Sequence, residues 1–227
     1  MLKLRIKFSK DGVMRYVGHL DLMRYFQKAI ARAKLPVAYS AGFNPHQIIS
    51  FAAPLGLGFT STAEYFDMEM TEAVSEREVI DALNAQMVEG MSVSGAAYLA
   101  DNAKNAMSIV AACDYIITPL HEDFDLRIFE AWEGMPEILM TKKTKKSENT
   151  VDIRPLIHSF AISGHSIGAK IAAGSAANLK PADMMQVLSE KLGYEWTGDD
   201  FLYQRTEIYA KDENGAFISL LDFTGEK

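Results

Sequence analysis

The sequence predicts an α+β protein made of tandem ferredoxin-like units, each with the element order β-α-β-β-α-β and the second one elaborated. Residues 2–8 alternate apolar and basic side chains, which is the period-two pattern of a half-buried strand. Residues 19–34 then repeat apolar side chains at helical spacing. A chain of 227 residues is long enough for two domains of ordinary size. We therefore expect one unit over residues 1–103 and a second over residues 104–227.

The first unit can be followed element by element. A turn at residues 9–12 follows the first strand, and Pro36 closes the first helix because a proline disfavours helical backbone at the residue before it. In the second helix, Ser75 and Glu78 have the spacing of a capping box. The other predicted elements are strands at 46–52, 63–70 and 91–99, a loop at 54–58 and the second helix at 71–87.

The second unit has a less regular pattern. Pro181 suits the first position of a helix, and a polar basic turn fills residues 141–147. No residue-level repeat decides between a degenerate duplicate of the first unit and an independent α+β unit. The predicted strands are 107–119, 137–140, 150–153, 157–162, 166–173 and 201–210, and the predicted helices are 122–132 and 181–191.

Composition limits the classes of protein to consider. No apolar run approaches the roughly 18–20 residues that span a bilayer, and the N-terminal alternation is unlike a signal peptide, so we expect a cytoplasmic protein. The single cysteine, Cys113, cannot form an internal disulfide or an all-cysteine metal site, and its apolar surroundings favour a buried small hydrophobe over a nucleophile. We expect no cofactor and no metal site.

Charge is distributed unevenly along the chain. Through residue 50 there are nine Lys/Arg and two Asp/Glu (9 − 2 = +7), whereas residues 51–140 have three and sixteen (3 − 16 = −13) in a chain of net charge −7. This asymmetry indicates a basic face for an anionic partner and an acidic band that would suit a protein partner.

The basic residues of the first helix follow one face. Arg24, Lys28 and Arg32 are about one helical turn apart, a spacing that suits successive phosphates of a nucleic acid. The alternative is a solvated helix face. Arg15 before the helix, together with bases on the first strand, is expected to widen the patch; the strand residues are Lys3, Arg5 and Lys7.

The loop after this helix has a distinctive sequence. Gly42 permits positive φ and Pro45 holds the preceding backbone extended, so both are assigned structural roles. Phe43 offers a ring on which a base can stack, while Asn44 and His46 offer hydrogen bonds. The alternative is a structural turn in which Phe43 plugs the core and Asn44 bonds local backbone.

Three residues form a candidate catalytic set. His19 and His46 flank the helix and the loop, and a histidine pair suits general acid–base chemistry or metal binding. Glu64 lies on an apolar strand face and therefore needs a partner, which we expect to be an arginine or histidine from the first helix or the loop. Further metal ligands would have to come from Glu64 or Asp67. A capping or packing role for His19 and a structural pair for Glu64 are the alternatives.

The second unit supplies fewer candidates. Lys142 and Lys143 belong to a basic loop with Lys145 and Lys146, which would attract a polyanion without reading its sequence or would simply be a solvated hairpin tip. Asp152, Arg154 and Arg205 adjoin predicted strands, and we assign them structural roles as an Asp–Arg pairing that fixes the second unit.

Seven segments carry a family resemblance: RYVGHLDLM (15–23), LPVAYSAGFNPH (35–46), ISFAAPLGLG (49–58), EYFD (64–67), TVDIRPL (150–156), KPAD (180–183) and RTE (205–207). Through them the chain resembles the radical SAM-linked proteins, a bacterial family of unknown function also called DUF2344. The resemblance implies a partner, because members are fused to or encoded beside a radical S-adenosylmethionine enzyme, often near a ribonuclease gene, and have no cluster motif themselves. A more distant resemblance, of fold only, is to CRISPR RNA-processing proteins with paired ferredoxin-like domains.

Three functional hypotheses follow. The leading one is a non-catalytic accessory module that binds RNA, such as tRNA or rRNA, through its basic face and acts with a separate radical S-adenosylmethionine enzyme. The second is an RNA-processing or RNA-modifying enzyme with a site near His19, His46 and Glu64. The third is a protein–protein adaptor that does not contact nucleic acid.

Overall fold

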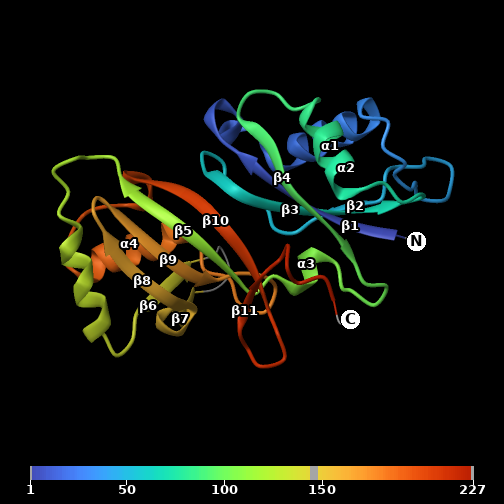
Figure 1. Ribbon diagram of the computed structural model, residues 1–227. Helices are drawn as coiled ribbons and strands as arrows, with labels where there is room; N and C mark the ends of the chain where they lie inside the picture. The colour runs from blue at the N-terminus through green and yellow to red at the C-terminus, as the bar shows by residue number, and fades with distance from the viewer. Residues whose placement is uncertain (1, 144–147, 226–227) are drawn as a thin grey trace. The chain divides into compact units, whose positions relative to one another are not determined.

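A computed structural model describes residues 2–143 and 148–225, without the side chains of Lys142, Lys143 and Glu148. The protein is a mixed α+β chain with a large, mostly antiparallel sheet and few helices. It divides into two compact units (Figure 1): unit 1 comprises Met1–Ala111 and Arg205–Lys227, and unit 2 comprises Ala112–Gln204.

Unit 1 has the element order that the sequence predicts for its first 99 residues. Its second helix begins later than expected because Ser75 is the N-cap: the Ser75 Oγ accepts a hydrogen bond from the Glu78 N–H, and the Ser75 N–H donates to the Glu78 carboxylate. The elements are β1 (Leu2–Lys10), η1 (Gly12–Tyr16), α1 (His19–Arg32), β2 (Ile49–Phe51), β3 (Thr60–Met70), α2 (Glu76–Asn84), β4 (Met91–Leu99) and α3 (Ala106–Ile109), completed by most of β10 (Phe201–Lys211) and by β11 (Phe217–Ser219).

The strands of unit 1 are hydrogen-bonded in the order β4-β1-β3-β10, with β2 also on β3 and β11 on β10. β1 is antiparallel to both β3 and β4, and β2 is antiparallel to β3. The register places Arg5 opposite Asp67 and Phe8 opposite Glu64. Two acidic residues of β3, Glu64 and Asp67, therefore lie opposite residues of β1.

One face of this sheet carries the core of unit 1. Leu4, Ile6 and Phe8 alternate along β1 and pack against apolar residues of α1 and α2, which cover the same face (Figure 1). Phe8, Phe26, Phe51 and Phe66 form an aromatic cluster with ring centroids 4.6 to 6.1 Å apart. The amphipathic pattern of residues 19–34 is thus used as expected, with its apolar side against the sheet.

Unit 2 is built on the strand order β10-β5-β9-β8, to which β10 contributes its first four residues. The segment predicted as a helix at 122–132 forms instead a 3₁₀ helix that begins at Leu126, and Cys113 is buried as expected. The elements are β5 (Ala112–Pro119), η2 (Leu126–Gly134), β6 (Leu139–Lys143), β7 (Glu148–Asp152), η3 (Arg154–Leu156), β8 (Ile157–Ser163), β9 (Ser166–Ala172), α4 (Pro181–Lys191) and η4 (Gly198–Asp200), with β6 and β7 as a separate two-stranded sheet.

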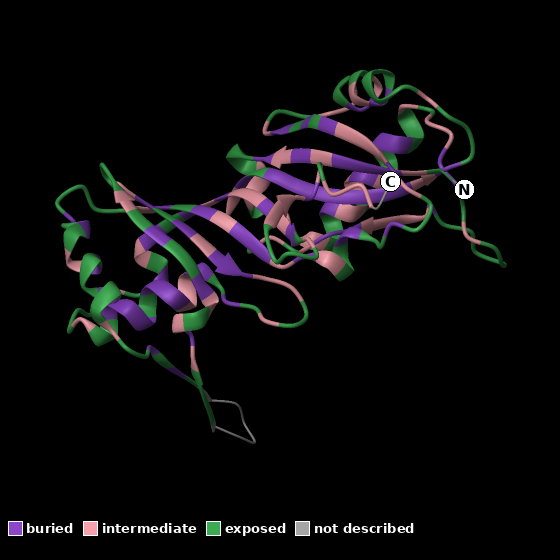
Figure 2. Cartoon of the chain, turned by 60° about the horizontal axis from the view of Figure 1, so that its bottom comes forward, coloured by how far each residue is buried: buried purple, intermediate pink, exposed green. Residues whose placement is uncertain are grey.

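The observed division differs from the predicted one at 103/104. Residues 104–111 and 205–227 belong to unit 1, since Arg205 pairs with Glu64 of β3 and Arg5 of β1 donates hydrogen bonds to the carbonyls of Leu220 and Phe223. Figure 2 shows that buried residues run along the strands of both units. Within the described residues, no helix is long and apolar enough to cross a membrane.

Candidate nucleic-acid interface

A shallow pocket of about 300 Å³ lies between α1 and the loop that follows it. It brings together two of the predicted basic residues, Arg24 and Lys28, with His46 of the predicted loop. The remaining lining residues are Gln27, Ala31, Tyr39 and Gln47. All belong to unit 1, so the arrangement is internal to that unit.

The loop is fixed at its base by hydrogen bonds between its two ends. Tyr39 and Gln47 form an antiparallel bridge, and the Ser40 N–H donates to the His46 carbonyl at 2.9 Å. The Ser40 Oγ accepts from the His46 N–H at 3.1 Å and also lies 2.9 Å from His46 Nδ1. When Ser40 donates to Nδ1, the imidazole proton is on Nε2, which is then a free donor at an exposed site.

The tip of the loop projects into solvent. Gly42 adopts φ of +114°, as expected for a residue that needs the freedom of glycine. The Phe43 ring is fully exposed, and Asn44 and Pro45 are exposed beside it. Phe43 therefore does not plug the core, and its ring is accessible for stacking.

The three basic side chains that were predicted to form one line on α1 do not all lie at the pocket. Lys28 is exposed at the pocket, and Arg24 forms a surface ion pair with Asp21 at 3.1 Å, a pairing that salt and solvent weaken. Arg32 instead donates from Nε to the Oε1 of Gln86 at 3.2 Å. The pocket thus holds two of the three cations.

Gln47 is a pocket residue that sequence reasoning missed. It is only 6% exposed, and its Nε2 donates to the Gln27 carbonyl at 3.2 Å and contacts the Tyr39 hydroxyl at 3.5 Å. Among the described residues, its Oε1 has no hydrogen-bond partner. A buried acceptor without a donor typically costs about 1–3 kcal/mol. The available signal was a polar residue directly before the apolar run Ile48-Ile49.

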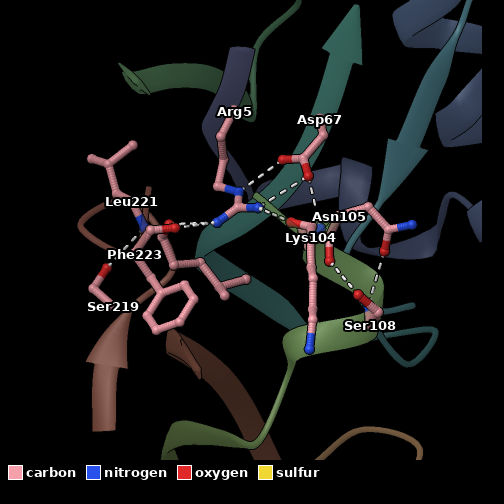
Figure 3. A network of polar contacts seen from close by, with 10 residues as sticks. Arg5, Asp67, Lys104, Asn105, Ser108, Ser219, Leu221 and Phe223 are labelled. Carbon is pink, nitrogen blue, oxygen red and sulfur yellow. Dashed lines mark hydrogen bonds and ion pairs between the residues drawn. The ribbon is translucent and has the colours of Figure 1, made fainter. Parts of the chain in front are cut away.

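The basic residues of the first strand do not extend the basic surface at the pocket, contrary to the sequence-based expectation. Arg5 is fully buried, and its guanidinium forms a bidentate pair with Asp67 at 2.7 and 3.0 Å (Figure 3). Its remaining N–H groups reach the carbonyls of Leu220 and Phe223, both at 2.9 Å, and that of Lys104 at 3.5 Å. A strand that is covered on both faces buries its polar residues as well as its apolar ones. The alternation of polar and apolar residues in the sequence does not show that the polar face is also covered.

Two further lysines of this strand are engaged in unit 1. Lys7 forms an ion pair with Glu207 at 2.7 Å. Lys10 is 2% exposed and donates to the Val17 carbonyl at 2.8 Å, and burial lowers its pKa. Glu207 also accepts from the Tyr65 hydroxyl at 2.6 Å; burial, followed by that bond, raises the pKa of Tyr65.

The three candidate catalytic residues have separate sets of contacts. The ring centroids of His19 and Phe51 lie 5.6 Å apart with the rings nearly perpendicular, whereas His46 contacts Ser40. Glu64 forms a buried bidentate pair with Arg205 at 2.8 and 2.5 Å. Its partner therefore comes from β10, not from the first helix or the loop as expected. Within the described residues, no group of three or more His, Cys, Asp or Glu is placed to hold a metal ion.

Arg15 lies on η1 and not in the pocket lining. Its guanidinium lies 5.0 Å from the Tyr16 ring centroid, and its carbonyl accepts from the Gly58 N–H at 2.9 Å. This bond connects the 54–58 loop to η1. Arg15 remains half-buried.

The expected Asp–Arg pairing of the second unit does not include Arg205, which belongs to unit 1 and pairs with Glu64; the remaining candidates of unit 2 make local contacts. The Asp152 carboxylate accepts from the backbone N–H groups of Ile138 and Arg154, both at 2.9 Å, and these bonds lower its pKa. The Arg154 guanidinium lies 4.2 Å from the Trp132 ring centroid. The side chains of Lys142 and Lys143, and all of Lys145 and Lys146, lie outside the described residues.

A second pocket, of about 430 Å³, lies beside the Arg5–Asp67 pair in unit 1. Lys104, Asn105 and Ser108 line it and appear in Figure 3 around α3. Lys3 and Glu69 face each other across β1 and β3 at its wall. Glu69 Oε2 is buried with no partner among the described residues.

Comparisons with known proteins identify a family for this chain and a solved structure of similar outline. No curated protein matches the chain. A chain in a solved structure entitled "Crystal Structure of a Cbf5-Nop10-Gar1 Complex" is similar with a TM-score of 0.48 and 11% identity, over 92% of this chain and 50% of that one. The family model described as "Uncharacterized protein conserved in bacteria (DUF2344)" matches residues 3–181. The chain therefore belongs to the DUF2344 family of bacterial proteins.

Proposed function

We propose that this protein is an accessory module that binds RNA through the pocket between α1 and the 40–46 loop. The observation that carries the proposal is the pocket itself, which joins Arg24 and Lys28 to His46 beside an exposed aromatic tip. Phosphate-directed cations next to a ring that is free to stack are the two components of single-strand binding surfaces.

The chemistry of each group suits a separate part of a nucleotide. Lys28 is an exposed ammonium that forms no ion pair with the described residues, and Arg24 can exchange its weak surface pair with Asp21 for a phosphate. His46 offers a ring N–H, and Phe43 offers its whole ring face. The bridge between Tyr39 and Gln47 holds the loop near α1 before any ligand binds, which lowers the entropic cost of binding.

The proposal includes a separate radical S-adenosylmethionine enzyme as partner and RNA such as tRNA or rRNA as the shared ligand. Support for the partner is the resemblance carried by the segments around His19 and the 40–46 loop. Cys113, the single cysteine, is fully buried, so any iron–sulfur cluster of a joint reaction would be held by the partner.

The strand orders support a tandem ferredoxin-like architecture. In unit 1 the order β4-β1-β3-β2 places the first strand between the fourth and third strands of the motif, as a β-α-β-β-α-β unit requires. In unit 2 the order β10-β5-β9-β8 has the same pattern, with η2 in the place of the first helix and the β6–β7 hairpin as the elaboration.

Salt-dependent RNA binding tests the function. Binding of total tRNA and of single-stranded oligomers should weaken with salt, and the variant Arg24→Met/Lys28→Met should lower the magnitude of the logarithmic salt slope by about 1.4, at about 0.7 for each lost single-strand phosphate contact. Arg77→Met is the matched control, because Arg77 is exposed and pairs with Asp81 as Arg24 pairs with Asp21.

Two outcomes would count against the proposal. Absence of RNA binding at low salt, or an unchanged slope in the double variant, would rule out this interface. If the tagged protein is isolated from cells with the enzyme and nuclease treatment leaves that association intact, while no RNA is recovered, the adaptor hypothesis is favoured instead.

A further inference from the structure

Gln47 lines the pocket and carries a buried hydrogen-bond acceptor. Its amide orientation is fixed by the Gln27 main-chain carbonyl, which can only accept and therefore requires the Nε2 to face it at 3.2 Å. The Oε1 is the atom left over, and no group in the described part of unit 1 donates to it. Gln47 as a whole is only 6% exposed. A donor carried by a ligand would complete this amide.

We propose that Gln47 Oε1 accepts a hydrogen bond from an N–H group of an unpaired RNA base, so that the pocket selects single-stranded RNA. This inference rests on the proposed RNA-binding function. Every RNA base carries such a donor on the edge that it uses for pairing: the amino groups of adenine and cytosine, the N1–H and amino group of guanine, and the N3–H of uracil. In a duplex these edges are occupied by the opposite strand, so only an unpaired base can present its donor to Gln47.

The surroundings fit a single base better than a helix. A volume of about 300 Å³ is at the lower end for a small-molecule site, and Lys28 and Arg24 line it on the α1 side, where they can hold the adjoining phosphates. The exposed Phe43 ring is available for a neighbouring base. Aromatic stacking and reading of exposed base edges are the usual means of recognising single-stranded RNA.

Access to Gln47 requires one side chain to turn aside, because its Oε1 is shielded from solvent in the ligand-free protein. Tyr39 is the side chain suited to this movement. It lines the pocket and is 55% exposed, and its hydroxyl lies 3.5 Å from Gln47 Nε2, while the main chains of the two residues form the antiparallel bridge at the start of the loop. The stronger bond to the Gln27 carbonyl would remain and keep the amide in place.

A chemical substitution in the RNA tests the hydrogen bond without altering the protein. Uridine has one base N–H, at N3, and methylation there removes it. We expect a ten-residue N3-methyluridine oligomer to bind roughly 3- to 10-fold more weakly than the uridine ten-mer, the range of one net hydrogen bond. A C5-methyluridine ten-mer carries a methyl group but keeps N3–H, so it should bind like uridine. Annealing the uridine ten-mer to its complement should also weaken binding.

The variant Gln47→Met tests the protein side of the same hydrogen bond, because it replaces the amide by an apolar side chain of similar length. It should bind the uridine and N3-methyluridine oligomers equally, whereas the control Gln186→Met, on exposed α4 surface, should keep the wild-type ratio. Equal binding of the two oligomers by the wild-type protein would overturn the inference. If both still bind with a salt slope that depends on Arg24 and Lys28, RNA binding stands and base reading fails; if neither binds, both proposals fail.

Discussion

Replacing Arg5 by methionine should remove a large part of the stability of unit 1 while leaving the pocket residues in place. The guanidinium is fully buried and makes bonds of 2.7 and 3.0 Å to Asp67 and two of 2.9 Å to the carbonyls of Leu220 and Phe223. Removing one partner of a buried ion pair costs about 3–5 kcal/mol, and the two carbonyls that lose their donor add roughly 1 kcal/mol. We expect a loss of about 4–6 kcal/mol, against a total of roughly 5–15 kcal/mol for an ordinary protein.

Native-state hydrogen exchange of the β1 and β3 amides is the appropriate measurement, because it reports the opening free energy of unit 1 separately from unit 2. Lys28→Met, an exposed change on α1, is the control and should stay within about 0.5 kcal/mol of the wild-type protein. Arg5→Met/Asp67→Leu should recover most of the loss, since no charge is then left buried alone. A loss of less than about 1 kcal/mol in Arg5→Met would refute the reasoning.

Two other predictions concern residues that the sequence analysis assigned to structural roles. Arg205→Met should destabilise unit 1 by about 3–5 kcal/mol in the same exchange experiment, because it leaves Glu64 buried without its partner; Arg205→Met/Glu64→Leu should be milder, and equal losses in the single and double variants would contradict this account. The pKa of Asp152 is lowered in the folded state by hydrogen bonds from the Ile138 and Arg154 amides, so its stabilising contribution is present above the unfolded pKa and is lost as pH falls through the folded one. Unfolding of unit 2, followed by tryptophan fluorescence, should therefore show a smaller loss of stability on acidification in Asp152→Asn than in the wild-type protein. The same acid dependence in both proteins would argue against this role of Asp152.

Local patterns predicted much of unit 1 because local chemistry determines it. The strand 2–8, the helix after residue 19 and the capping box at Ser75 each follow from spacing or capping within a few residues. The 122–132 segment was less predictable: its apolar residues suit a helix, but it forms a 3₁₀ helix that buries Phe129 and Trp132. Tertiary packing decides the form of such a short segment.

The candidate site was predictable in part, for the same reason. The loop and Arg24 with Lys28 were identified because glycine, proline and helical spacing act locally. The fate of Arg5 and the partner of Glu64 were not, because the residues that bind them lie 62 to 218 positions away along the chain. Gln47 was missed because its importance arises from an atom without a partner, and a sequence does not show which atoms will be buried.

The bonds from Arg5 to Leu220 and Phe223 also have a consequence for folding during synthesis. They join residues separated by 215 and 218 positions, so Arg5 lacks these two carbonyl acceptors until residues 220–223 have been synthesised, although its ion-pair partner Asp67 lies only 62 positions away. Unit 2, whose residues are contiguous from Ala112 to Gln204, has all its parts before unit 1 does. A nascent chain should therefore acquire protease resistance in its middle before it does so near its beginning, and a fragment ending before Arg205 should leave unit 1 open to cleavage.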